Sequence, residues 1–528
     1  MDLRKARNPY VYASATVLGM LLLGWLFGQL MATSDNTYKR LLLLQDVVNQ
    51  VSLRYVDEIP ADNLYHRAVE GLLDGLDPYT ELIPAQDFER FSEIQIRSEY
   101  VGVGVSITRT NEQIVIMNVY PGSSAYRKGV QPGDRIVKIN EESTHNWTTE
   151  QVSLRMLGEK GSQVELTVSR HGAEEPIKFM LTRNPVVVPT VTRHFMLDAT
   201  TGYIRLATFT ERSADELRSH LQELLNQGMK SLVLDLRDNS GGLTDAAVEI
   251  CELFIEGRKL VVAIKGRRAE ESSSYFSDGK PLLKNGLIAV LINEYTASSS
   301  EIVAGALQDH DRAVIVGKNS YGKGLVQTTY PLKNGDVLKI TTARYYTPSG
   351  RNIQREFFSR IRMYQEDEEI EPEPEPEIQA VFKTDMGREV LGGGGIAPDV
   401  DVAFDSAAAD PYVVKLNSYT FDFAVAYKSM NPGLAQPFKA DRRVYDAFVS
   451  YLEGKDFQVD AKKMERYRGY ITDYLLTYRI AEIAWDDNAA YRMVAKVDPQ
   501  LNRAVQVLGS GSDQKTILKK LSEQEGSE

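Results

Sequence analysis

The chain has 528 residues, too many for one hydrophobic core, so several domains are expected. Hydrophobic residues make up 43% and charged residues 25%, which is ordinary for a globular protein. The net charge of −12 argues against nucleic acid as a partner, because a phosphate-binding surface needs clustered Lys and Arg. The single cysteine, Cys251, excludes an intramolecular disulfide, and its acidic neighbours argue against a nucleophilic thiol.

The N-terminus predicts a membrane helix. Three basic residues among the first seven precede an uncharged, mostly apolar run from Val11 to Ala32. About 20 such residues span a bilayer as a helix, and basic flanks stay cytoplasmic. We therefore expect a cell-envelope protein, anchored in the inner membrane, whose working part faces the periplasm or the exterior. A cleaved signal segment within residues 1–36 is the alternative, and it also exports the rest of the chain.

Two small domains are expected next. Residues 37–98 carry apolar side chains at helical spacing, which predicts a helical domain. Residues 99–185 change to a period of two and predict a β-rich domain of short strands, the first running from Val101 to Ile107. Two short helices fit within it, at Ser123–Lys128 and at Thr148–Leu157, each followed by a glycine.

The remainder completes a multidomain α/β chain. Residues 186–404 alternate buried strands, such as Leu287–Ile292, with glycine- or serine-rich turns and helical patterns. Within them, residues 366–377 form an acidic run interrupted by prolines, which we expect to be a solvated loop. Residues 405–528 carry aromatic and aliphatic stripes that predict a helical region, whose role the sequence does not indicate.

Ser298 is a candidate nucleophile. It follows the predicted strand Leu287–Ile292 and precedes a helix that starts near Ser299. A serine at such a junction is exposed beside the free amides of a helix start, which can hold developing negative charge. The pattern Ser298-x-x-Glu301 is also a capping box, which needs no catalysis.

Lys323 is a candidate general base. Lys323, Leu325 and Gln327 alternate along what the sequence predicts to be a strand, so Lys323 and Gln327 should project to the same side. Partial burial among glycines and aliphatic residues would favour the neutral amine, which can accept a proton. Gln327 could orient that amine without adding charge.

The segment before Lys323 also approaches a phosphate-binding loop. Gly317-x-x-x-x-Gly322-Lys323 has the right glycines, but Gly324 stands where a Ser or Thr should bind magnesium, and a strand pattern comes next instead of a helix. Nucleotide binding is therefore the weaker alternative. A third segment, Asp235 to Gly242, ends in two glycines whose N–H groups could face a reacting oxygen.

Together these segments resemble the carboxyl-terminal processing, or tail-specific, serine peptidases. The matching strings are Asp235-Leu-Arg-x-Asn-x-Gly-Gly, Ala297-Ser-Ser-Ser-Glu-Ile-x-Ala-Gly-Ala-Leu-x-Asp309, Gly317-Lys-x-Ser-Tyr-Gly-Lys-Gly-x-Val-Gln327, Tyr345-Tyr-Thr-Pro-Ser-Gly-Arg-x-Ile-Gln354 and Gly395-Ile-x-Pro-Asp399. The resemblance implies that Ser298 is the nucleophile, Lys323 the base and Gln327 its orienting partner. It also implies an oxyanion hole made by backbone N–H groups at Gly241 or Gly242 and at Ser299. The family commonly alternates small residues with serines here, so Ser299 and Ser300 remain rival nucleophiles.

Residues 99–183 resemble a PDZ domain, which this family carries before its catalytic core. The matching loop, whose amides would hold the carboxylate of a peptide tail, consists of Tyr100, Val101, Gly102, Val103, Gly104 and Val105. The peptide would add as a strand beside Val103–Ile107. Val152 and Met156, one helical turn apart, would line the pocket for the last side chain, although a buried helix face explains each of them equally well.

The function implied is a serine endopeptidase that cleaves proteins or peptides with accessible C-termini through an acyl-enzyme. No metal or organic cofactor is implied, and none of the six histidines falls in a motif. The alternative is an inactive PDZ scaffold that binds C-terminal peptides in the envelope. The physiological substrate, the effect of the PDZ domain on the protease and the oligomeric state, including a homo-oligomer, stay open.

Overall fold

A computed structural model describes residues 38–110, 112–355, 380–455 and 457–525. The described residues divide into two compact units, residues 38–82 and the described residues from 83 onward. The predicted membrane helix (Val11 to Ala32) and the acidic loop 366–377 lie outside the described residues. Within the described ranges, every helix is too short or too polar to cross a membrane.

The first unit is helical where the structure describes it. One helix covers residues 38–54, and α2 covers Ala61–Asp74. The predicted helical domain also extends into three short elements further along the chain: β1 (Glu81–Ile83), α3 (Ala85–Phe91) and a π-helical turn (Ser92–Ile96). The segment 37–98 therefore mixes helices with a short strand.

The β-rich domain is built on an antiparallel sheet in the order β3-β4-β5-β7-β8, with β6 paired to β5. Its elements are β3 (Val105–Thr110), β4 (Gln113–Val119), α4 (Ser124–Lys128), β5 (Arg135–Ile139), β6 (Glu142–Ser143), α5 (Thr149–Met156), β7 (Gln163–Ser169) and β8 (Ile177–Thr182). Both helices lie where the sequence predicts them, because Ser123 and Thr148 cap their first turns.

The first predicted strand of this domain is broken in two. β2 (Glu99–Gly102) pairs with β9 (Asn184–Val187) in a separate sheet, and β3 begins only at Val105. Gly104 lies between them with φ 88°, a conformation that ends the strand. A side chain there would also collide with Ser123, whose Cβ would lie 2.1 Å from the added Cβ. The prediction of one strand from Val101 to Ile107 was therefore wrong.

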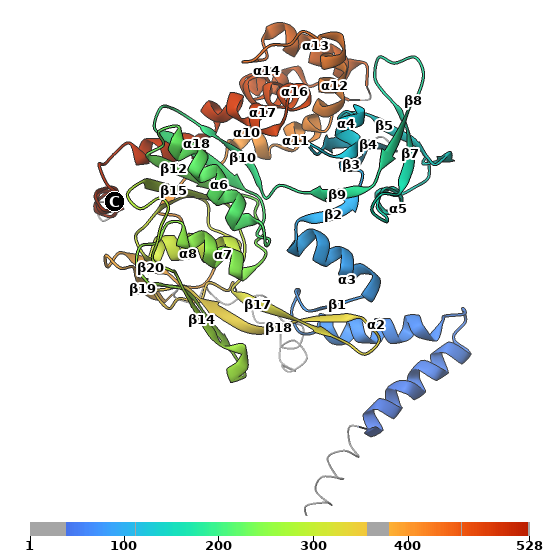
Figure 1. The fold of residues 1–528 in the computed structure, drawn as a ribbon, viewed down its shortest axis with the longest axis horizontal. Coiled ribbons are helices and arrows are strands. Elements are labelled where there is room, and N and C mark those ends of the chain that lie inside the picture. The colour runs from blue at the N-terminus through green and yellow to red at the C-terminus, as the bar shows by residue number, and fades with distance from the viewer. Residues whose placement is uncertain (1–37, 111, 356–379, 456, 526–528) are drawn as a thin grey trace, which may run out of the picture. The chain divides into compact units, whose positions relative to one another are not determined.

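The α/β core is a sheet in the order β10-β11-β12-β15-β16-β21. Strands β10, β12 and β15 are labelled in Figure 1. The strands are β10 (Val191–Met196), β11 (Thr201–Leu206), β12 (Ser231–Asp235), β15 (Leu287–Ile292), β16 (Val314–Gly317) and β21 (Val400–Asp401). Only β10 is antiparallel to its neighbour; all the other pairs are parallel. The apolar runs that predicted β12, β15 and β16 suit parallel strands, which are buried on both faces.

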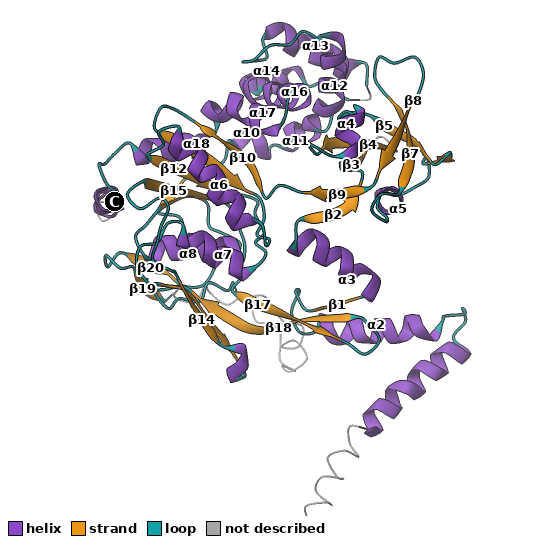
Figure 2. Cartoon of the chain, viewed as in Figure 1, coloured by secondary structure: helices purple, strands orange, loops and turns teal. Residues whose placement is uncertain are grey.

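Helices cover both faces of this sheet (Figure 2). Leu232 and Leu234 point to one face, where they pack with α6 (Ser213–Asn226), α7 (Thr244–Glu252) and α8 (Ser299–Asp309). Val233 points to the other face and packs with residues of α17 (Asp487–Val494), α18 (Pro499–Leu508) and α19 (Gln514–Glu525). The end of the C-terminal region thus forms the third layer of the core.

A second sheet contains β13 (Leu260–Gly266), β14 (Ser273–Phe276), β17 (Leu325–Pro331) and β18 (Val337–Tyr346). A single turn of 3-10 helix (Ala269–Glu271) joins β13 to β14, and β19 (Val381–Lys383) pairs with β20 (Glu389–Leu391) in a small hairpin. β17 and β18 form a long antiparallel ribbon that starts just after Lys323. The loop that contains Lys323 therefore joins β16 of the main sheet to β17 of this ribbon.

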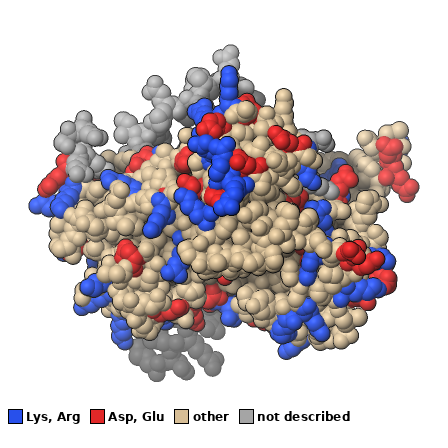
Figure 3. Space-filling view, turned by 90° about the horizontal axis from the view of Figure 1, so that it is seen from above, with Lys and Arg blue, Asp and Glu red and all other residues tan. Residues whose placement is uncertain are grey.

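The rest of the C-terminal region is a helical cluster, as predicted. It contains α10 (Ser406–Ala409), α11 (Pro411–Asn417), α12 (Thr420–Met430), α13 (Arg442–Glu453), α14 (Ala461–Arg466), α15 (Arg468–Tyr470), a π-helical segment (Ile471–Leu476), α16 (Thr477–Ala484) and a 3-10 turn (Ala495–Val497). Val115 of the β-rich domain is buried in the core of this cluster, and Arg135 forms an ion pair with Asp422 at 3.1 Å. Across the face shown in Figure 3, Lys and Arg are interspersed with Asp and Glu.

Candidate active site

The candidate catalytic residues lie on loops that leave three adjacent parallel strands. β12, β15 and β16 are neighbours in the sheet and end at Asp235, Ile292 and Gly317. Because parallel strands end at the same edge, the loops after them meet there, at the carboxyl edge where α/β sheets bind ligands. Those loops contain Gly241 and Gly242, Ser298, and Lys323 respectively.

Ser298 lies at the turn into α8 in a strained conformation. Its φ of 56° and ψ of −117° are outside the regions that a serine ordinarily adopts, at a cost of about 1–3 kcal/mol. Ser298 is partly exposed, whereas Ser299 and Ser300 are buried. The Ser299 hydroxyl donates to the Gly242 carbonyl at 2.8 Å, and the Ser300 hydroxyl donates to the Asn239 carbonyl at 2.9 Å. Of the three serines, Ser298 alone is both accessible and strained.

A buried carboxylate, Glu301, joins the segments of Ser298 and Lys323. Glu301 Oε2 accepts from the backbone N–H of Ser298 at 2.8 Å and from that of Lys323 at 2.9 Å. Glu301 Oε1 accepts from the Gly322 N–H at 2.7 Å and from the Ser320 hydroxyl. Burial raises the pKa of Glu301 in spite of these donors. Because one oxygen holds both N–H groups, the backbones of the two candidate catalytic residues lie side by side.

The strand predicted to contain Lys323 begins two residues later, at Leu325. Lys323 lies in the preceding loop because its N–H donates to Glu301 and not to a neighbouring strand. A bulge between Val326 and Gln327 also shifts the register, so the alternation argument for Lys323 and Gln327 was wrong. Gln327 is half-buried on β17, and its Nε2 donates to Thr341 Oγ1 at 3.1 Å. The strand after Lys323 also excludes the phosphate-loop alternative, which needs a helix there.

Gly241 and Gly242 pack directly against the candidate nucleophile. Gly241 has φ 98°, and an added Cβ would lie 2.7 Å from Ser298 Cβ. Gly242 passes so close to Phe209 that an added Cβ would be 2.0 Å from the Phe209 carbonyl oxygen. The Gly241 N–H donates to Asn239 Oδ1 at 2.9 Å, while the Gly242 N–H donates to no acceptor among the described residues.

Several residues that hold this site were in the quoted motifs but had no predicted role. Asn239 is fully buried, and its backbone carbonyl also accepts from the Ala297 N–H at 3.0 Å. The Tyr345 hydroxyl donates to the Ser298 carbonyl at 3.1 Å. Both residues therefore fix the backbone on either side of the candidate nucleophile. Their place in the motif strings was the only signal of this in the sequence.

Residues of the C-terminal region also contact the segment from Asp235 to Gly242, which is called the glycine loop below. The sequence did not indicate this contact. Arg237, two residues before Asn239, forms buried ion pairs with Asp235 at 2.6 Å and with Asp498 at 2.9 Å. Its guanidinium also donates to the Tyr491 hydroxyl at 3.0 Å. Burial alone would raise the pKa of Asp235, but Arg237 and Arg205 hold that pKa below its usual range. The carboxylate is therefore ionised, and the pair is compensated.

The candidate peptide groove lies in the β-rich domain. β3 is an edge strand, so its outer side can accept a further strand. In the described structure, no acceptor meets the N–H groups of Val103 and Gly104, just before that edge. Tyr100, Val101 and Gly102 belong instead to β2, paired with β9. Val152 and Met156, on α5, are buried in the core of the domain beside Val103 and Val105.

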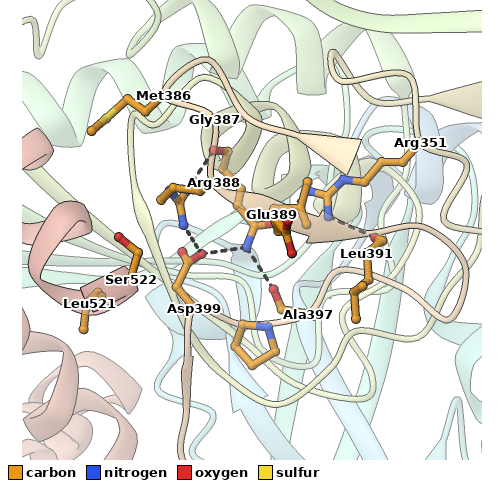
Figure 4. Close-up of a pocket in the computed structure, with 13 residues that line it drawn as sticks. Arg351, Met386, Gly387, Arg388, Glu389, Leu391, Ala397, Asp399, Leu521 and Ser522 are labelled. Carbon is orange, nitrogen blue, oxygen red and sulfur yellow. Dashed lines mark hydrogen bonds and ion pairs between the residues drawn. The ribbon is translucent and has the colours of Figure 1, made fainter. Parts of the chain in front are cut away.

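The structure also contains a cavity of about 550 Å³ at the other end of α8 (Figure 4). The cavity is lined by Gln308, near the last residue of α8, and by Arg351, Arg388 and Asp399 among others. Ser298 precedes the first residue of α8, and this helix is about 16 Å long. The arginines of the cavity are already paired: Arg388 with Asp399 at 2.6 Å, and Arg351 with Asp309 at 2.7 Å. This cavity is therefore separate from the candidate catalytic loops.

Known proteins resemble this chain in sequence. The model of peptidase family S41 matches residues 200–362, and the model of the PDZ domain matches residues 92–169. A carboxy-terminal-processing protease of Bartonella bacilliformis is 35% identical over 325 residues, which are 61% of this chain and 74% of that protein. A probable CtpA-like serine protease of Staphylococcus aureus is 32% identical over 311 residues, which are 59% of this chain and 62% of that protein. Among solved structures, a photosystem II D1 C-terminal processing protease is 27% identical; the match covers 67% of this chain and 85% of that one, with a TM-score of 0.35.

Proposed function

The chain belongs to peptidase family S41, the carboxy-terminal-processing serine proteases, and from that membership we propose that Ser298 and Lys323 are its catalytic dyad. The observation that carries this assignment is the Glu301 carboxylate, one oxygen of which accepts from the N–H groups of both residues. A nucleophile and its base have to come within hydrogen-bond reach during the reaction, and adjacent backbones allow this. The strained φ of Ser298 supports the same assignment, because strain of this kind clusters at functional sites.

In the proposed reaction, the neutral amine of Lys323 takes the proton of the Ser298 hydroxyl as Oγ attacks the carbonyl carbon of the scissile peptide bond. The resulting ammonium then gives its proton to the leaving amine, which produces an acyl-enzyme. A water molecule, deprotonated by the same amine, releases the acyl group. Gln327 acts as a positioning residue: its Nε2 is held by Thr341, so Oε1 is the atom that can accept from Lys323.

The tetrahedral intermediate carries a negative oxygen, which needs backbone donors. The Gly242 N–H fits this role, because it meets no acceptor in the part of the chain that the structure describes. The N–H of Ser299 is the second donor, at the start of α8 and adjacent to the nucleophile. Gly241 is less suited to donate, since its own N–H is bound to Asn239. Its missing side chain instead gives the substrate and Ser298 room.

We assign substrates as proteins or peptides with an accessible C-terminal tail. The tail would add as a strand along the free edge of β3, with its carboxylate at the N–H groups of Val103 and Gly104. Val152 and Met156 lie beneath this edge, so they would form the floor for the last side chain of the tail. Tyr100, Val101 and Gly102, being paired with β9, would shape the loop without contacting the added strand.

Three variants test the dyad against the scaffold alternative. Ser298→Ala and Lys323→Arg should each abolish cleavage of a tail-bearing protein while the fold and tail binding persist, because a guanidinium cannot act as a base at neutral pH. Ser300→Ala is the matched control: it removes one buried hydrogen bond, to the Asn239 carbonyl, and should keep most of the activity. Full activity of Ser298→Ala would move the nucleophile elsewhere, and an inactive wild type would favour a PDZ scaffold.

We further infer that the chain works outside the cytoplasm, anchored by the apolar segment Val11 to Ala32. The support for this is the sequence alone. About 20 uncharged residues follow a basic N-terminus, a pattern that matches a membrane helix whose N-terminal end stays in the cytoplasm. In this position the peptidase would face the exported proteins of the envelope.

A further inference from the structure

Two histidines and a glutamate form a cluster outside the catalytic loops. His194 lies on β10, the edge strand of the main sheet, and His220 and Glu223 lie on α6, which packs against it. The three side chains offer donor atoms that lie within 4.8 Å of one another. Peptide hydrolysis by the proposed dyad uses none of them.

The fold holds these residues on facing surfaces. His220 and Glu223 are three positions apart on α6, a spacing that puts two side chains on one face of a helix. His194 reaches the same place from the strand, and its backbone N–H is fixed by a 2.9 Å hydrogen bond to Asn488 Oδ1. The neighbouring Arg193 is on the opposite face of the sheet, where it pairs with Asp487, so it brings no competing positive charge.

Two of the three separations between donor atoms are close to those found around a tetrahedral ion. Glu223 Oε2 lies 3.5 Å from His194 Nε2 and 3.6 Å from His220 Nδ1. Donor atoms on tetrahedral zinc, with bonds of about 2.0–2.1 Å, are about 3.3 Å apart. Glu223 Oε1 is turned the other way, toward Gln227 Nε2 at 3.4 Å. A single carboxylate oxygen therefore faces both imidazoles.

The His220 imidazole has one buried nitrogen that lacks a hydrogen-bond partner in the described structure. Its Nδ1 is buried and has no hydrogen-bond partner in the described structure, because the contact with Glu223 is too long for one. A buried polar nitrogen without a partner costs about 1–3 kcal/mol. The two imidazoles are stacked, with ring centroids 3.7 Å apart and planes inclined by 27°. One ring has to turn about its Cβ–Cγ bond for both lone pairs to meet at one point, and each side chain is about a quarter exposed, which leaves room to turn.

We propose that His194, His220 and Glu223 bind one Zn²⁺ ion, with water in the fourth position. Imidazole nitrogens select zinc and its neighbours in the first transition row over calcium and magnesium, which prefer oxygen ligands. The partly exposed Glu223 leaves one side open to water. The ion links α6 to the edge strand β10, and α6 leads directly into β12 and its glycine loop. The site lies outside the catalytic loops and is separate from the proposed Ser298–Lys323 chemistry.

The proposal is tested by titrating the purified full-length chain, stripped of metal with a chelator, with Zn²⁺ in a calorimeter. Wild type should bind one equivalent and unfold at a higher temperature with zinc than without it. His194→Gln and His220→Gln should each weaken binding by at least the roughly 100-fold that loss of an outer-shell partner can cost. Co²⁺ in place of zinc should give the intense visible absorption of a tetrahedral site in wild type only.

His66→Gln is the matched control, because His66 and Glu70 form an exposed pair at 3.3 Å on one helix without a second histidine. It should bind zinc as wild type does. Retained peptidase activity in each variant verifies folding. The proposal is overturned if wild type binds no zinc, or if both cluster variants bind it with unchanged affinity.

Discussion

Gly241 is the position where a single added methyl group probes the active-site geometry most sharply. Gly241 has φ 98°, and a Cβ there would lie 2.7 Å from Ser298 Cβ, 2.8 Å from the Ala297 carbonyl oxygen and 2.9 Å from the Ser299 nitrogen. Ordinary van der Waals contact begins at 3.4 Å. Gly241→Ala therefore has to push the Ser298 turn away from the glycine loop.

Two effects of this substitution can be separated by size. An alanine at positive φ costs about 1–2 kcal/mol of folding free energy wherever it occurs. The displacement of Ser298 adds a loss of activity, since misplacing a reacting group by about 1 Å costs on the order of 100-fold. Gly228→Ala isolates the first effect, because Gly228 has φ 97° and its added Cβ would meet no atom closer than 3.9 Å.

The two variants are compared by urea unfolding and by kcat/KM on a fluorogenic tail peptide. Gly228→Ala should lose only the stability that positive φ costs, and Gly241→Ala should lose more because its Cβ also meets backbone atoms closer than 3.0 Å. Only Gly241→Ala should lose kcat/KM, by roughly 10- to 100-fold. The loss should lie in kcat, because the proposed binding of the tail takes place in the PDZ domain, away from Gly241. Equal activity of the two variants at 25 °C, a temperature at which both are folded, would refute the proposed contact between the glycine loop and the nucleophile.

Two further predictions concern the ends of the substrate and of the chain. A peptide whose C-terminus is amidated should bind the full-length Ser298→Ala protein at least about tenfold more weakly than the free acid, because the N–H groups of Val103 and Gly104 then meet no charge. Calorimetry with both peptides measures the two affinities. Equal affinities would contradict the proposal that these N–H groups bind the carboxylate of the tail. Deleting residues 1–37 should release the peptidase from the membrane fraction without lowering its activity; a deleted form that still sediments with membranes would rule out the anchor.

Local features of the catalytic core could be predicted because they rest on local physics. The strand Leu287–Ile292 is an unbroken apolar run, as a strand buried on both faces must be, and the turn and helix after it are determined by Ser298 and Glu301. The position of Lys323 could not be predicted in the same way. Its loop conformation depends on the distant Glu301 carboxylate, and a bulge before Gln327 breaks the period of two on which the strand prediction rested.

Long-range contacts account for the other differences. The strand predicted from Val101 is interrupted between Gly102 and Val105, where Ser123, from another part of the domain, packs against Gly104. Likewise, nothing near Arg237 in the sequence indicates that Asp498 and Tyr491, in the C-terminal helices, complete its surroundings. The helical sequence pattern around Asp498 and Tyr491 does not indicate which distant residue they contact. Their contacts with Arg237 are therefore visible only in the folded chain.

The central claim, that Lys323 activates Ser298, is tested most directly by trapping the acyl-enzyme. The full-length protein is mixed with a tail-bearing substrate, quenched in acid during turnover, digested and analysed by mass spectrometry. Wild type should carry the acyl mass on Ser298, and Lys323→Arg should carry none. An acyl group on Ser299 or Ser300, or wild-type acylation of the Lys323→Arg variant, would contradict the proposed dyad.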